Sequence, residues 1–173
     1  NPQACYETEL IYVKTDKPKN IAVIGAGPAG MSFAAVAAER GHNVTIFDQD
    51  TQIGGQFNIA KQVPGKEEFY ETIRYFGVMM KKHGVNLQLG KRVNADDVKE
   101  FDEVVLATGI APRQLPLEGI THPKVLSYIE VLRDKKPVGK RVAVIGAGGI
   151  GMDTSEYLTH DQSHAPASID INE

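Results

Sequence analysis

The chain has 173 residues, of which 42% are hydrophobic and 24% charged, and its formal net charge is −3. This length and composition are typical of a globular, soluble protein with one full core and room for part of a second. The slightly acidic balance argues against nucleic-acid binding, which needs a basic face, and no apolar run approaches the roughly 20 residues that span a bilayer. The single cysteine, Cys5, excludes an internal disulfide and a four-cysteine metal site. It favours a reducing compartment, and we expect a cytoplasmic location.

We expect the chain to be a piece of a larger enzyme. It begins with Asn1 rather than methionine, and no charged segment with an apolar run follows, so the start is not a signal peptide. Residues 1–19 have no clear periodicity and predict a linker with one short strand at residues 10–13. The polar run from residue 160 to residue 173 completes no recognisable element.

A strand, a helix and a second strand follow the linker directly. Residues 21–24 are a short apolar run that ends in glycine, the pattern of a buried strand. Residues 28–40 are rich in alanine and Gly41 closes them, which predicts a helix with its stop signal. Residues 44–47 predict the next strand. This succession builds a parallel sheet.

The later elements continue this alternation. Residues 66–83 predict a helix whose apolar side chains recur on one face, at Phe69, Ile73, Phe76 and Met80. The other predicted elements are strands at residues 85–89, 104–107 and 142–145 and a helix at residues 128–136. We expect the strands that begin at residues 21, 44, 104 and 142 to share one sheet, covered by the helices that begin at residues 28 and 66.

The first glycine turn, Gly25-x-Gly27-x-x-Gly30, has the pattern of a dinucleotide-binding fingerprint. Gly25 permits the tight turn out of the strand, Gly27 lets the backbone approach a pyrophosphate, and Gly30 lets the helix pack closely on the strand. The helix start, with Pro28 in its first turn, offers N–H groups and a positive dipole end to phosphates. Asp48 ends the second strand, where a carboxylate can accept hydrogen bonds from a ribose. The strand before and the helix after the turn are what the motif requires. The alternatives are a flexible turn and, for Asp48, an ordinary surface position.

Two further segments are candidates for contacts with a ligand. Gly54 and Gly55 allow close backbone approach, and Gln56 can hydrogen-bond a ligand; a plain turn is the alternative. Thr108 and Gly109 follow a strand at the carboxyl edge of the sheet, where ligands of open α/β folds bind. A simple exit from strand to loop is the alternative there.

The first turn has a second copy later in the chain. The sequence AVIGAG occurs at residues 22–27 and again at residues 143–148, and the second copy gives the fingerprint Gly146-x-Gly148-x-x-Gly151. A strand and a helix are predicted around it, whereas the second strand that would carry a ribose-reading residue is not in the chain. We interpret it as a nucleotide site of the parent enzyme that is incomplete here.

The remaining polar residues predict no catalytic or metal site. His42, His83 and His122 stand beside glycine or proline and are interpreted as surface loop residues. His160 and His164 could share a metal only on a helix, which we disfavour. No Ser-His-Asp or Cys-His constellation can be assembled.

Three longer runs are specific enough to indicate a family. They are IGGQFNIAKQVPGKEEFYETIRYF at residues 53–76, VLATGIAPR at residues 105–113 and HPKVLSYIEVLRDKKPVGKRVAVIGAGGIG at residues 122–151. They resemble bacterial NADPH-dependent 2,4-dienoyl-CoA reductases, in the old-yellow-enzyme group that also holds trimethylamine dehydrogenase. The resemblance covers nearly the whole chain, apart from the tail after Leu158.

The resemblance implies the cofactors and the residues that bind them. In that family an FMN-binding TIM barrel comes first, then a 4Fe–4S segment, then FAD- and NADPH-binding domains. It implies that the chain starts just after the last cluster cysteine, that Cys5 is not a cluster ligand, and that the barrel and the closing FAD segment are missing partners from the same parent chain. The residues implied for FAD are Gly25, Gly27, Pro28, Ala29, Gly30, Asp48, Gly54, Gly55, Gln56, Val93, Thr108 and Gly109. Those implied for NADPH are Gly146, Gly148, Gly149, Ile150 and Gly151.

We therefore expect an α/β fold of the Rossmann type with a parallel sheet and the start of a second nucleotide-binding unit. The expected domains are a linker over 1–19, an FAD unit over 20–115, a connector over 116–139 and the beginning of an NADPH unit over 140–173. The implied parent is an NADPH-dependent 2,4-dienoyl-CoA reductase of fatty acid degradation, and the piece by itself should be inactive. An amine dehydrogenase of the same group and a non-redox nucleotide-binding module are the alternatives.

Overall fold

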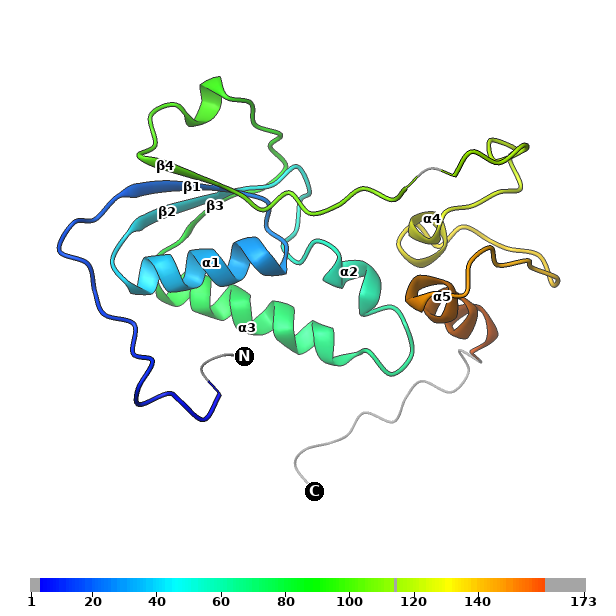
Figure 1. Ribbon diagram of the computed structural model, residues 1–173, viewed down its shortest axis with the longest axis horizontal. Helices are drawn as coiled ribbons and strands as arrows, with labels where there is room; N and C mark the ends of the chain where they lie inside the picture. Colours follow the sequence, from blue (N-terminus) through cyan, green and yellow to red (C-terminus); the bar gives the residue numbers. More distant parts are fainter. Residues whose placement is uncertain (1–3, 114, 161–173) are drawn as a thin grey trace. The chain divides into compact units, whose positions relative to one another are not determined.

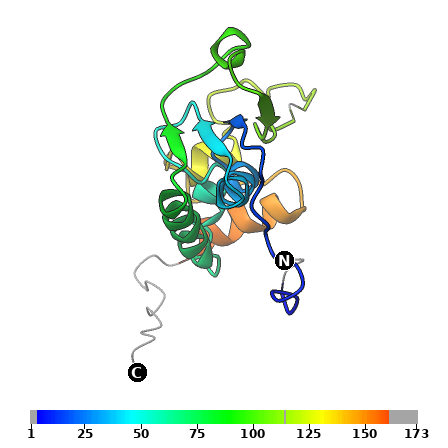
Figure 2. The same ribbon diagram turned by 90° about the vertical axis from the view of Figure 1, so that its left-hand side faces the viewer.

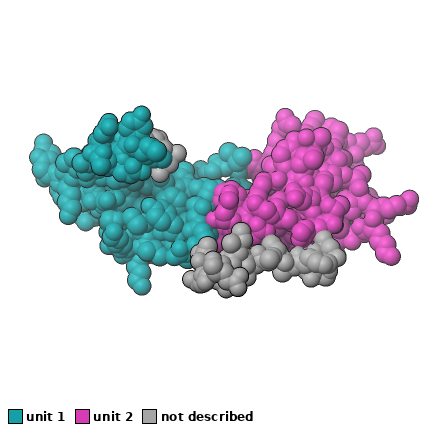
Figure 3. All heavy atoms as spheres, turned by 90° about the horizontal axis from the view of Figure 1, so that it is seen from below, with its two compact units in different colours: residues 1–57, 71–110 teal, residues 58–70, 111–173 magenta. Residues whose placement is uncertain are grey.

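The computed structural model describes residues 4–113 and 115–160. The chain divides into two compact units (Figure 3). Unit 1 consists of the described residues of 1–57 and 71–110, and unit 2 of those of 58–70 and 111–173. No helix of the described residues combines the length and the apolar character that crossing a membrane requires.

Unit 1 contains a four-stranded parallel sheet with the strand order β3-β2-β1-β4. The strands are β1 (Asn20–Ile24), β2 (Asn43–Phe47), β3 (Asn86–Gln88) and β4 (Glu103–Leu106). In the register, Val23 of β1 lies opposite Ile46 of β2 and Val105 of β4, so the three side chains project from the same face. A parallel sheet with helical crossovers is the Rossmann type of α/β fold, and this prediction is confirmed.

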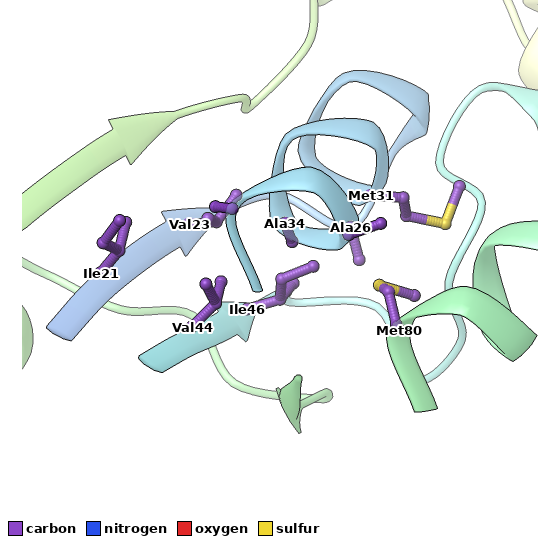
Figure 4. Close-up of a cluster of buried hydrophobic side chains, with 10 residues drawn as sticks. Ile21, Val23, Ala26, Met31, Ala34, Val44, Ile46 and Met80 are labelled. Atoms are coloured by element: carbon purple, nitrogen blue, oxygen red, sulfur yellow. The ribbon is translucent and has the colours of Figure 1, made fainter. Parts of the chain in front are cut away.

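Two helices cover one face of this sheet. In both ribbon views α1 (Pro28–Glu39) and α3 (Glu68–Lys82) lie on the same side of the strands (Figures 1 and 2). Figure 4 shows the hydrophobic core between the sheet and these two helices. Its fully buried side chains include Val23 and Ile46 from the sheet, Met31 from α1 and Met80 from α3. Burial of a side chain of this size contributes roughly 1.5–3 kcal/mol. Both helices form close to their predicted bounds of 28–40, from the alanine-rich run with its glycine stop, and 66–83, from the apolar periodicity.

Two predicted strands do not form. The backbone is irregular at residues 10–13 and 142–145. The fourth strand of the sheet is β3 and not the segment 142–145. The prediction that the segment from residue 142 joins the sheet is therefore wrong. A strand persists only where a neighbouring strand pairs with its N–H and C=O groups, and among the described residues no strand lies beside 142–145.

The side chains of β4 are more exposed than its apolar sequence suggests. Val104 is 43% exposed and Leu106 is 77% exposed. β4 is an edge strand that pairs only with β1, and the side chains of Val104 and Leu106 alternate to the face opposite α1 and α3. These two side chains are exposed because no helix of unit 1 covers that face among the described residues, whereas Val105 on the other face is partly buried in the core.

Unit 2 consists of short helices in its described part. α2 (Phe57–Ala60) leads into it, and α4 (Tyr128–Leu132) and α5 (Gly149–Thr159) follow. Its small core joins the segment 58–70 to α4 and α5, through Ile59, Val63, Tyr128, Ile129, Leu132 and Tyr157. α4 ends earlier than predicted, because Lys135 takes the left-handed backbone conformation with φ +54°. A single 3₁₀ turn, η1 (Asp96–Val98), precedes β4 in unit 1.

Candidate nucleotide-binding sites

Gly25 and Gly30 are required by the fold of the first turn. Gly25 has φ +114°, and a Cβ built on it would overlap the carbonyl oxygen of Ala107, just beyond β4. Its N–H donates a hydrogen bond to the carbonyl oxygen of Phe47 at 2.7 Å. A Cβ on Gly30 would overlap the carbonyl oxygen of Gly25. Both glycines therefore let neighbouring backbone segments meet at the carboxyl end of β1.

Gly27 differs from these two glycines, because the protein itself leaves room for a side chain there. Its φ of −76° and ψ of −178° suit any residue. Among the described residues, the nearest atom to a Cβ built on it is the Cα of Gly55, at 4.0 Å, an ordinary contact. Neither the backbone nor the packing of the described residues demands glycine at this position.

The helix start behind Gly27 presents backbone donors. Gly27 is the N-cap of α1 and Pro28 is its first helical residue, and no side chain caps the helix. The first intrahelical hydrogen bond runs from the N–H of Met31 to the carbonyl oxygen of Gly27, at 2.9 Å. The N–H groups of Ala29 and Gly30 precede it and point along the helix axis, where the positive end of the dipole favours an anion.

The second predicted loop lies directly against the first turn. The N–H of Gly54 donates to the carbonyl oxygen of Ala26 at 2.8 Å. Gly55 has φ +50°, and a Cβ on it would lie 2.9 Å from the Cα of Gly27, closer than real Cβ atoms come. The structure thus brings Gly54 and Gly55 onto the fingerprint turn, with the exposed Gln56 following them.

Asp48 joins the end of β2 to the fingerprint turn. Its Oδ2 accepts a hydrogen bond from the N–H of Ala26 at 2.6 Å, and its Oδ1 accepts one from the N–H of Asp50 at 2.8 Å. The sequence pattern did not reveal this role of the carboxylate. Two carboxylate oxygens offer about four acceptor positions, so acceptor capacity remains for ribose hydroxyls.

The remaining residues implied for FAD lie around the same edge. Thr108 and Gly109 follow β4, and the N–H nitrogen of Thr108 lies 3.3 Å from a Cβ built on Gly25. Val93 is half-buried and follows Lys91, whose N–H donates to the carbonyl oxygen of Asp48 at 2.8 Å. The structure therefore brings Thr108 and Gly109 to the carboxyl ends of β1 and β4, where open α/β sheets bind ligands, while Val93 lies two residues beyond the backbone contact with Asp48.

The second turn repeats the backbone of the first. Gly146 has φ +111°, Gly148 is the N-cap of α5 with φ −83° and ψ −177°, and a Cβ on Gly151 would overlap the carbonyl oxygen of Gly146. Gly149 and Ile150 form the first turn of α5. Among the described residues nothing lies within 4 Å of a Cβ on Gly146 or Gly148. The turn is therefore formed, but in the part of the chain that the structure describes no other segment packs against Gly146 or Gly148.

The histidines stay scattered. The Nδ1 of His42 accepts from the N–H of Lys19, and that of His122 from the N–H of Lys124. His83 differs from the expected loop residue, since it is half-buried at the end of α3 with its Nε2 buried and unpartnered among the described residues. His160 caps the C-terminus of α5, and His164 lies outside the described residues.

Comparisons with known proteins show the family to which the chain belongs. Residues 19–166 match the profile of the pyridine nucleotide-disulphide oxidoreductases. A bilirubin reductase from Mediterraneibacter gnavus is 38% identical over 160 residues, which cover 91% of this chain and 25% of that protein. A cinnamate reductase from Clostridium sporogenes is 36% identical over 165 residues, covering 91% and 24%. A solved structure of a 2-naphthoyl-CoA reductase in complex with 2-naphthoyl-CoA superposes with a TM-score of 0.85 at 36% identity, covering 91% of this chain and 24% of that one. The chain spans about a quarter of the length of these relatives.

Proposed function

Because the chain belongs to the pyridine nucleotide-disulphide oxidoreductase family, we propose that it is the dinucleotide-binding part of a larger flavin- and nicotinamide-dependent reductase. Within this proposal, unit 1 holds FAD and the second turn contributes to an NADPH site. The relatives' names, bilirubin reductase and cinnamate reductase, support a reductase in the complete protein.

The single observation that carries the proposal is Gly27. The described residues require glycine at Gly25, Gly30 and Gly55, whereas at Gly27 they leave a Cβ at ordinary distance from everything around it. A glycine that the fold does not need, at the N-cap of a helix with unsatisfied N–H groups, is explained by a ligand that approaches the backbone closely. A pyrophosphate is such a ligand.

The assignment of FAD to the first turn follows from the surrounding residues. Asp48 supplies a carboxylate at the end of β2, suited to ribose hydroxyls and repulsive to a 2′-phosphate, and Gly54 and Gly55 bring a second backbone segment to the same place. FAD carries no 2′-phosphate, so these groups favour it over NADPH. The matching backbone of the second turn supports NADPH there.

The finer proposal is a 2,4-dienoyl-CoA reductase. The acyl-CoA in the name of the 2-naphthoyl-CoA reductase supports a CoA thioester as the substrate class. In the complete enzyme the two dinucleotides would supply hydride transfer from NADPH to FAD, and a 4Fe–4S cluster and FMN would supply single-electron transfer and the reduction of the conjugated double bonds of the dienoyl thioester. This chain contributes the residues that bind and orient the two dinucleotides, while FMN, cluster and substrate are held outside its 173 residues.

Cofactor analysis of the complete enzyme tests the proposal. The purified enzyme is denatured, and the released flavins are separated and quantified beside an NADPH titration of the native enzyme. We expect FAD together with FMN, and saturable NADPH binding. An enzyme without FAD contradicts the first part of the proposal. Turnover assays of the same enzyme test the finer part, and an enzyme that oxidises amines but reduces no dienoyl thioester contradicts it.

A further inference from the structure

α5, the helix that follows the second glycine turn, packs against residues 58–70, which come much earlier in the chain. Residues 58–70 follow the Gly54-Gly55 loop and pack on α4 and α5 in unit 2. Ile59 and Val63 of this segment share the small core with Tyr157 of α5. Polar contacts add to it, because Lys135 Nζ donates to Gln62 Oε1 at 2.8 Å and lies 4.6 Å from the centre of the Tyr157 ring.

One contact in this assembly involves a pair of charges near the start of α5. Lys66 Nζ lies 2.6 Å from Asp153 Oδ2, and only 27% of the Asp153 side chain is exposed. Asp153 stands four residues after Gly149, where α5 begins, which is about 6 Å along the helix axis at about 1.5 Å per residue. This distance is shorter than the Debye length of about 8–10 Å at physiological salt.

A carboxylate in this position opposes the binding that the helix start favours. The pyrophosphate and the 2′-phosphate of NADPH are negative, and an uncompensated carboxylate within a screening length of the helix N-terminus repels them. The ammonium of Lys66 cancels this charge.

We infer that Lys66 is a positioning residue of the second nucleotide site, which sets the affinity for NADPH by neutralising Asp153 rather than by contacting the cofactor. The inference rests on the proposed function of the second turn. It differs from a purely mechanical role of the ion pair, because it predicts opposite consequences for the two partners. Removal of the lysine leaves a carboxylate that repels NADPH, whereas removal of the carboxylate's charge leaves the Lys66 ammonium, which attracts it.

The test uses four variants of the complete enzyme: Lys66→Ala, Lys66→Arg, Asp153→Asn and the double variant Lys66→Ala/Asp153→Asn. We expect Lys66→Ala to raise the Kd and the KM for NADPH about three- to tenfold at low salt with kcat unchanged. We expect Asp153→Asn to lower the Kd for NADPH, because it leaves the Lys66 ammonium uncompensated, and the double variant and Lys66→Arg to stay within about twofold of the unmodified enzyme. The increase in Lys66→Ala should shrink above about 0.5 M salt, because salt screens the repulsion.

Lys61→Ala is the matched control. Lys61 belongs to the same segment, but its ammonium lies over the Tyr70 ring at 4.5 Å from the centroid. FAD content, measured in every variant, reports whether the first site is intact. Equal weakening in Lys66→Ala and Asp153→Asn, without recovery in the double variant, overturns the inference in favour of a mechanical tether, and so does an unchanged Kd in Lys66→Ala. An unmodified enzyme that binds no NADPH contradicts the proposed function itself.

Discussion

Asp48 at the end of β2 accepts a hydrogen bond from the N–H of Ala26, inside the first glycine turn, at 2.6 Å. The carboxylate therefore supports the shape of the turn and also lies where we propose that the ribose of FAD binds. Its removal should affect the protein both with and without FAD. We expect Asp48→Ala to lower the free energy of unfolding by about 1–2 kcal/mol, since hydrogen bonds to a charged group are lost at a partly buried site.

The same substitution should also weaken FAD in the complete enzyme by about 1–3 kcal/mol. Urea unfolding of the chain and flavin titration of the apoenzyme measure the two effects separately. Asp50→Ala is the control, because Asp50 joins the network through its backbone N–H, which the substitution retains. If Asp48→Ala changes stability but not FAD affinity, Asp48 supports the turn and does not contact the ribose.

Gly27→Ala should separate ligand binding from folding. The Cβ of alanine at this position meets nothing closer than the Gly55 Cα at 4.0 Å among the described residues, so the free energy of unfolding should change by less than about 0.5 kcal/mol. The affinity for FAD should fall about tenfold or more, because the methyl group occupies the path of the pyrophosphate.

Gly25→Ala is the matched comparison for that experiment. Its Cβ would overlap the carbonyl oxygen of Ala107, and its φ is +114°, so we expect it to destabilise unit 1 by more than about 1 kcal/mol even without FAD. Unfolding curves and flavin content of both variants are the measurements. Unchanged flavin in Gly27→Ala counts decisively against the site.

The chain on its own should not reduce a 2,4-dienoyl thioester. It spans about a quarter of the length of its relatives, and its one cysteine cannot hold an iron–sulfur cluster, which needs several thiolates. An assay of the purified chain with a dienoyl-CoA, NADPH, FAD and FMN decides the matter. Turnover above the rate of the cofactors alone would mean that the barrel is not needed for the chemistry, against the finer proposal.

The start of α4 should lose stability in acid. The hydrogen bond from Lys136, then those from the Ser127 backbone and hydroxyl, lower the pKa of Glu130 from 4.5 to about 2. Since the carboxylate is the form that the folded state prefers, its contribution is present above about pH 4.5 and is lost as the pH falls toward 2. Carbon NMR titration of the Glu130 carboxyl should give a midpoint near pH 2.

Lys136→Ala should move that midpoint upward, because it removes the largest cause of the shift. Lys124→Ala, elsewhere in unit 2, should leave it in place. If the midpoint of Glu130 in the unmodified chain stays at about 4.5, the hydrogen bonds of its carboxylate to Lys136 and Ser127 do not persist in solution.

Much of unit 1 could be predicted from local patterns. The alternation of apolar runs and glycines placed β1, α1 and β2 within a residue of their observed bounds, because each element's hydrogen bonds and apolar face follow its own periodicity. The support that Asp48 gives to Ala26 could not be predicted, since it joins residues 22 positions apart whose proximity arises only when β2 pairs with β1. The ion pair of Lys66 with Asp153 is more distant still, and no spacing rule relates the two residues.

The hexapeptide AVIGAG, which occurs twice, shows what the local sequence determines and what depends on the tertiary structure. By itself it determined the glycine turn, because Gly25 and Gly146 reach φ +114° and φ +111° in quite different surroundings and both turns lead into a helix capped by glycine. Only the tertiary structure decided whether the residues before the turn are a strand. Val23 is fully buried between β2 and β4, whereas Val144, in the same sequence, is 42% exposed and irregular. A turn closes with its own backbone, but a strand exists only where neighbouring strands accept and donate its hydrogen bonds.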